Sequence, residues 1–174
     1  MEFDPSGKFL ASFGGGMFAF PHGFTVDAEG SVWASDANAR ETVLGLSAKG
    51  PNGITRGHQV FKFSPTGAVL MTLGKQGVKG SGPDTFDQPT GIAIAPSGDI
   101  FVTDGHGKND RVLKFSKDGR FIKSWGHHGT GPGEFDQPHS SNRRCSSAFA
   151  AWSQSSAEAF RAPRGELLVV SGTA

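Results

Sequence analysis

The sequence predicts an all-β fold, a partial β-propeller of four-stranded antiparallel blades. Two stretches of the 174-residue chain, Pro21–Asp36 and Pro89–Asp104, are copies of one module with the same internal spacing. Each is followed by a second matched block, Gln59–Gly74 in the first module and Arg111–Gly126 in the second. Four-stranded units that repeat about every 40–50 residues are typical of propeller blades.

The matched blocks have the pattern of short strands joined by tight turns. In the second module, β-branched and aromatic runs are interrupted by Pro96-Ser97-Gly98 and Lys117-Asp118-Gly119, which predict hairpin turns. The modules differ in length only between the blocks, and most of the extra residues fall at 38–57, where we expect a loop. The predicted strands of the second module are Gly91–Ala95, Ile100–Thr103, Val112–Ser116 and Phe121–Trp125.

Residues 1–140 are expected to hold an incomplete set of blades, followed by an irregular C-terminal tail. The matching pattern stops at Ser141, and the tail 141–174 is rich in Ser, Ala and Arg, with Ala148–Phe160 as a weak helix and Leu167–Val170 as one strand. Two interpretations of the tail remain open: a reading-frame change or a truncation, or a genuine divergent tail. Disorder of the tail is a separate expectation. The expected parts of the propeller are a half blade at 3–18, blades at 21–74 and 89–126, and the start of another at 135–140.

Composition excludes several classes of function. The net charge is +1, and no basic face is evident, which argues against nucleic-acid binding. No apolar run is long enough to predict a membrane span. The polar N-terminus has no pattern of a signal peptide, and the single Cys145 cannot form an internal disulfide, so the cellular compartment is unknown from these features.

Two histidines occupy the same position of the module. His22 and His139 both follow the proline that opens a blade, and the blade between them has Thr90 there. The first strand of a blade usually lines the propeller axis, so histidines in alternate blades of a six-bladed ring would place three imidazoles around it. That arrangement suits catalytic zinc, which takes three protein ligands and keeps a fourth position open. The alternative is that these histidines are polar residues at loop ends, wetted by the channel.

A further histidine lies in Asp104-Gly105-His106-Gly107, just after the second predicted strand of its blade. His106 is a candidate acid–base residue near a channel metal, or else a turn residue whose flanking glycines accommodate positive φ. Asp36 and Asp104 are expected to bond turn backbone. The remaining histidines, His58, His127 and His128, are expected at the solvated surface.

The module resembles the NHL repeat. Its motifs Pro-His-Gly-Phe-Thr-Val-Asp, Gln-Pro-Thr-Gly-Ile-Ala-Ile, Val-Thr-Asp-Gly-His and Gly-Glu-Phe-Asp-Gln-Pro-His-Ser are most similar to peptidyl-α-hydroxyglycine α-amidating lyase and its bacterial homologues. The resemblance covers roughly residues 3–140 and implies a six-bladed parent fold. It also implies cleavage of a peptidyl-α-hydroxyglycine to a peptide amide and glyoxylate, with zinc on three histidines and a bracing calcium ion. Members of the family are often secreted or periplasmic.

Carried over residue by residue, the resemblance makes His22 and His139 two of the three zinc ligands and the carbonyl of Phe24 a calcium ligand. The third zinc histidine has no match. His106 stands where the family has a tyrosine thought to act as a base, which changes the unperturbed pKa from about 10 to about 6.5.

Two functions therefore follow from the sequence. The first is a fragment of a zinc-dependent lyase, inactive alone because one zinc ligand is missing. The second is an NHL scaffold that binds a protein, a peptide or a small ligand in its channel without chemistry.

Overall fold

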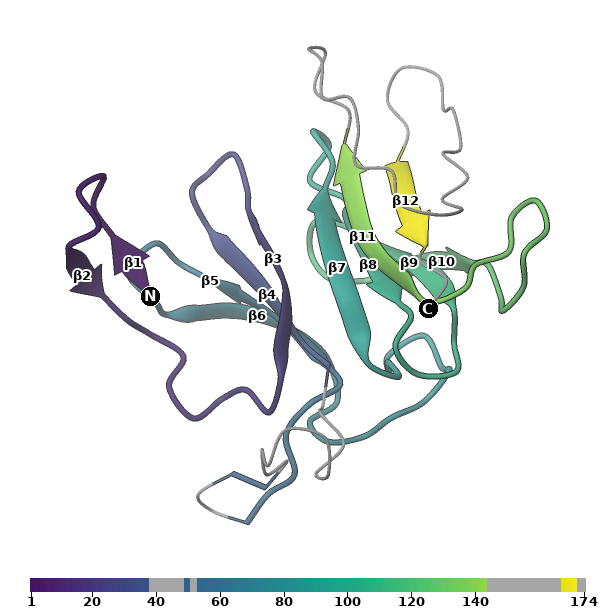
Figure 1. The fold of residues 1–174 in the computed structure, drawn as a ribbon, viewed down its shortest axis with the longest axis horizontal. Helices are drawn as coiled ribbons and strands as arrows, with labels where there is room; N and C mark the ends of the chain where they lie inside the picture. Colours follow the sequence, from purple (N-terminus) through teal and green to yellow (C-terminus); the bar gives the residue numbers. More distant parts are fainter. Residues whose placement is uncertain (38–48, 51–52, 144–166, 172–174) are drawn as a thin grey trace.

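The computed structural model describes residues 1–37, 49–50, 53–143 and 167–171, and within these ranges it confirms the all-β prediction (Figure 1). Each strand runs antiparallel to its sheet neighbours. The strands are β1 (Glu2–Phe3), β2 (Phe9–Ala11), β3 (Pro21–Val26), β4 (Val32–Asp36), β5 (Gln59–Phe63), β6 (Val69–Gly74), β7 (Pro89–Ile94), β8 (Ile100–Asp104), β9 (Arg111–Phe115), β10 (Phe121–Trp125), β11 (Pro138–Arg143) and β12 (Leu167–Ser171).

The two matched modules form two four-stranded sheets, the blades. Their orders are β3-β4-β5-β6 and β7-β8-β9-β10, so each blade follows the chain without a crossover. The first strands of successive blades are neighbours, because β3 contacts β7 and β7 contacts β11 (Figure 1). The residues after Pro21, Pro89 and Pro138 therefore meet along one rim, which is what the module pattern predicted.

Shorter pairs flank the blades. The hairpin β1–β2 overlaps the segment 3–18 expected as a half blade, beginning one residue before it at Glu2. Strand β11 pairs with β12, so the strand expected at Leu167–Val170 forms. The weak helix expected at Ala148–Phe160 and most of the loop expected at 38–57 fall outside the described residues. None of the described segments is a helix long and apolar enough to cross a membrane.

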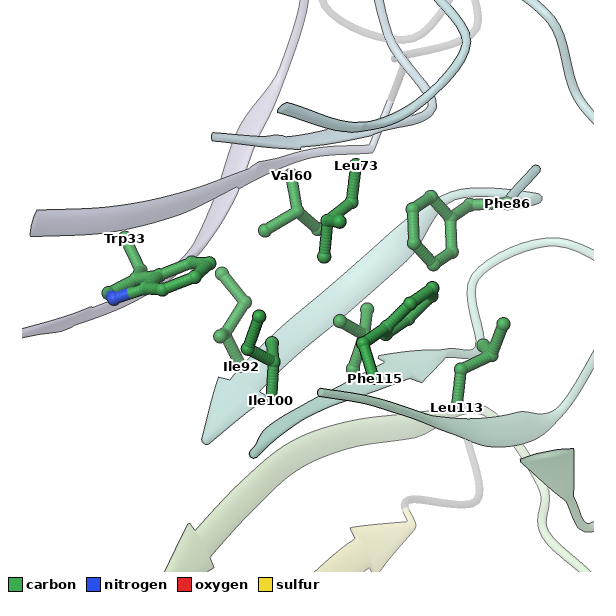
Figure 2. Packing of buried hydrophobic residues seen from close by; sticks show 9 residues of the cluster. Trp33, Val60, Leu73, Phe86, Ile92, Ile100, Leu113 and Phe115 are labelled. Atoms are coloured by element: carbon green, nitrogen blue, oxygen red, sulfur yellow. The ribbon is translucent and has the colours of Figure 1, made fainter. Parts of the chain in front are cut away.

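The main hydrophobic core lies between the two blades rather than inside either one (Figure 2). Trp33, Val60 and Leu73 of the first blade face Ile92 and Phe115 of the second. Alternation along each strand puts every second side chain on this shared face. The core is completed by Phe86 of the connecting segment and by Ile100, Val102 and Leu113 of the second blade.

A buried aspartate ends the second strand of each blade and fixes the start of its first strand. The carboxylate of Asp36 accepts hydrogen bonds from the backbone N–H groups of Ala19 and Phe20 at 2.7–3.1 Å. The carboxylate of Asp104 accepts one from the N–H of Asp87 at 2.8 Å. Both aspartates are fully buried, and the expectation that they bond turn backbone is confirmed.

A second repeated contact joins each blade to the segment that leads into the next. His58 Nδ1 accepts a hydrogen bond from the backbone N–H of Gln88 at 3.2 Å, and Asp110 Oδ1 accepts one from that of Gln137 at 2.9 Å. His58 and Asp110 occupy equivalent module positions, directly before the third strand. His58 is only 4% exposed, so the prediction of a solvated side chain was wrong for it. The reason is that its backbone, at φ 60°, turns the ring under the incoming segment.

The other two histidines expected at the surface are there. The side chains of His127 and His128 are 73% and 70% exposed, and each lies beside a carboxylate, Glu134 for the former and Asp110 for the latter.

Acidification should weaken the contact between His58 and the backbone of Gln88. Burial lowers the pKa of His58 below its usual 6.5, more than the nearby Asp87 and Asp36 raise it. The unfolded chain therefore takes up a proton before the folded chain does, so stability falls as the pH drops through about 6.5. His58→Asn keeps an acceptor and tolerates positive φ, but does not titrate. We expect its free energy of urea unfolding to change less between pH 8 and pH 5 than that of the wild type.

His127→Asn is the matched control, because it removes an exposed histidine and should keep the pH dependence of the wild type. An equal loss of stability on acidification in the wild type and His58→Asn would contradict the prediction.

Candidate metal centre

Three histidines from three separate elements converge at the rim where the first strands meet. His22 lies on β3, His139 on β11, and His106 in the loop after β8. One ring nitrogen from each lies within 4.8 Å of those of the other two. The ring centroids are 4.7 Å apart for His22 and His106, 5.4 Å for His22 and His139, and 4.2 Å for His106 and His139. Among the described residues, this is the one group of three or more His, Cys, Asp or Glu side chains placed to share a metal ion.

The carbonyl of Thr90 orients the ring of His22. His22 Nδ1 lies 3.0 Å from this oxygen, which can only accept, so Nδ1 carries the proton. In the neutral ring the lone pair is then on Nε2, and Nε2 lies 2.9 Å from Nε2 of His106. A ring N–H bonded to a carbonyl is the usual way in which proteins fix the tautomer of a metal-binding histidine.

Thr90 also fixes the backbone next to His139. Its hydroxyl donates to the carbonyl of Pro138 and lies 2.8 Å from the hydroxyl of Thr103. A hydroxyl has one proton to donate, so Thr103 supplies the donor for the second contact. Thr90 is 1% exposed. Its contacts connect the position of His22 in the preceding blade with that of His139 on the following first strand.

Two glycines allow His106 to reach the cluster. A Cβ on Gly105 would lie 2.5 Å from both Cδ and the carbonyl oxygen of Pro138, and one on Gly107 would collide with Asp87. Neither glycine has positive φ, so the interpretation that they serve a left-handed turn was wrong, and close packing is the reason for both. The N–H of His106 donates to the carbonyl of Gln88 at 3.3 Å, which holds this loop against the first strand.

The surroundings favour the neutral form of His106 and His139. Partial burial, together with the neighbouring His139 and His22, lowers the pKa of His106 to about 4. Burial and the charge of His22 also lower the pKa of His139. Neutral imidazole is a common metal ligand and a possible proton acceptor, so the cluster suits metal binding and acid–base chemistry.

The structure thus brings together His22, His139 and His106. Their roles as ligands and as a catalytic residue remain predictions. Phe24 lies two residues beyond His22 on β3, with its side chain 70% exposed, and its carbonyl as a calcium ligand also remains a prediction.

Sequence reasoning missed the direct contact of His106 with both other histidines. The place of His106 just after Asp104 was a signal for this contact, because Asp104 pairs with Pro89, the first residue of β7. The residues just after Asp104 must therefore emerge at the same rim as the residues that open the first strands. The contribution of Thr90 to the orientation of the His22 ring could not be read from the sequence, since it is made by a backbone carbonyl.

The paired sheets and the histidine cluster at the rim where their first strands meet define a repeat protein of the β-propeller class with a candidate metal centre. Residues 94–141 match a family described as a 6-bladed beta-propeller. The chain belongs to the NHL-repeat β-propellers and is related to the peptidyl-α-hydroxyglycine α-amidating lyases.

Three relatives illustrate this. The chain is 36% identical over 79% of its length to mouse (Mus musculus) peptidyl-glycine alpha-amidating monooxygenase, of which it spans 13%. It is 37% identical over 71% of its length to peptidyl-alpha-hydroxyglycine alpha-amidating lyase 1 of Drosophila melanogaster, of which it spans 20%. It is 35% identical over 69% of its length to mouse NHL repeat-containing protein 3, of which it spans 32%.

Among solved structures, the chain is similar to a catalytically inactive virginiamycin B lyase from Staphylococcus aureus, with a TM-score of 0.44 and 14% identity. The match covers 76% of this chain and 33% of that one.

Gly105→Ala should destabilise the protein by about 1–3 kcal/mol, because the added methyl group overlaps the backbone of Pro138 and must push the strands apart. Gly15→Ala is the matched control. A Cβ there meets nothing within 4 Å, and its cost should stay within about 0.5 kcal/mol. Urea unfolding of the two variants measures the difference, and equal stabilities would refute the close-packing role of Gly105.

Proposed function

We propose that this chain is part of a zinc-dependent lyase of the peptidyl-α-hydroxyglycine type. The observation that carries the proposal is the meeting of His22 and His139, at equivalent module positions, on the rim of the first strands. The likeness to an amidating lyase over 71% of the chain supports the same reaction class.

The donor set fits zinc. Borderline divalent ions bind imidazole nitrogens, and His22 presents an unprotonated Nε2 because its other nitrogen donates to Thr90. When bound, zinc would act as a Lewis acid on the substrate hydroxyl and lower its pKa. In the reaction, the hydroxyl loses its proton, a carbonyl forms on the same carbon, the C–N bond breaks, and the amide nitrogen gains a proton.

In this mechanism the chain supplies positioning. The Thr90 carbonyl holds the His22 ring, and the Thr90 hydroxyl holds the backbone before His139. The resemblance would give His106 a role in proton transfer, since it stands in place of the family's tyrosine. The resemblance would also place a calcium ion at the carbonyl of Phe24. The mechanism does not use calcium.

The chain by itself is proposed to be inactive, and a peptide would bind in the channel of a longer parent. The alternative is a non-catalytic scaffold that binds a protein or a small ligand. The 35% identity to mouse NHL repeat-containing protein 3, a relative named for its repeat, supports this alternative.

A chimaera tests the lyase proposal. Residues 1–140 replace the matching segment of the Drosophila lyase, and release of glyoxylate from a peptidyl-α-hydroxyglycine is measured in the presence of zinc. We expect turnover, and we expect His22→Ala to lower kcat/KM by more than about 100-fold, the upper end of what losing an outer-shell partner costs.

His127→Ala in the same chimaera should leave turnover unchanged, since this side chain is 73% exposed and lies outside the cluster. A folded, zinc-binding chimaera that releases no glyoxylate would favour the scaffold.

A further inference from the structure

We infer that His106 is a metal ligand, and that residues 22–139 hold a complete three-imidazole site for a borderline divalent ion such as zinc. The site needs no histidine from a later blade. The inference uses the cluster described above but does not depend on the lyase reaction.

The spacing of the ring nitrogens fits one ion. Zn–N distances of about 2.0–2.1 Å in a tetrahedral site set N–N separations of about 3.3–3.4 Å. In the cluster, Nε2 of His22 and Nε2 of His106 are 2.9 Å apart, and no separation within the group exceeds 4.8 Å. The required separation lies between these values, so small ring rotations bring all three nitrogens to an ion.

The ring of His106 is directed into the cluster. Its Nε2 faces Nε2 of His22, and the ring lies edge-to-face against both other rings, at interplanar angles of 74° and 71°. Since the Thr90 contact leaves the His22 nitrogen without a proton, the two nitrogens share either one proton or one cation.

All three ligands are held in place by contacts with the surrounding backbone. His22 is fixed by the carbonyl of Thr90, and His139 follows Pro138, whose carbonyl accepts from the Thr90 hydroxyl. His106 is held by its own N–H bond to Gln88 and by the close packing of Gly105. Such preorganisation favours metal binding, because little ordering remains to be done when the ion arrives. Three nitrogen ligands select zinc, copper or nickel over magnesium or calcium, which need oxygen.

The inference predicts that the full 174-residue chain binds one zinc ion, measured by competition with a chromophoric chelator at pH 7.5. His106→Ala should weaken this affinity by about 100-fold or more, as should His22→Ala and His139→Ala. His106→Tyr, which restores the residue found in the resembling family, should weaken it as well. His127→Ala is the control and should bind as the wild type does. Circular dichroism establishes that each variant is folded.

A second measurement needs no variant. In the wild-type chain labelled with ¹⁵N, zinc should shift the Nε2 resonance of His106 together with a ring-nitrogen resonance of His22 and of His139. The inference is overturned if only His22 and His139 respond, or if His106→Ala binds zinc within about twofold of the wild type.

Absence of zinc binding by the wild-type chain would also overturn the inference. It would leave the lyase proposal standing, because the chimaera takes its third histidine from the other blades.

Discussion

The arrangement of the inner strands depends on one buried residue, Thr90. Its carbonyl accepts from the ring of His22 on the preceding blade, and its hydroxyl donates to Pro138 on the following strand. Gly23 makes the first of these approaches possible, because a Cβ there would collide with the same carbonyl. These polar contacts thus hold three successive first strands at fixed separations. They lie in a region shielded from water, where an unmade hydrogen bond would be costly.

Much of the fold was readable from the sequence because blades are made of local patterns. The turn at Pro96-Ser97-Gly98 and the alternation along Ile100–Asp104 act over a few residues, and repetition of both identified the module. The burial of His58 was not readable in this way. It depends on a segment 30 residues further along the chain, and only the equivalence with Asp110 hinted at a common role.

The candidate site was predicted in part for the same reason. His22 and His139 share a module position, and residues at the same position of a repeat lie at the same place in their blades. The equivalent position of the first module, two residues after Asp36, is occupied by Asn38 and not by a histidine, so repetition could not place His106. Its approach to the other rings rests on the space left by Gly105 and Gly107, a packing property that composition does not reveal.

The location of the hydrophobic core affects how this protein unfolds locally. Trp33 and Phe115 belong to different blades yet to one buried cluster, so neither sheet has a closed interior of its own. Loss of one blade exposes the apolar face of the other, and backbone amides in β5 and β8 should therefore exchange with solvent in a single cooperative event. The hairpin β1–β2, whose Phe3 and Phe9 are 53% and 52% exposed, contributes no residue to this cluster, so we expect its amides to exchange separately.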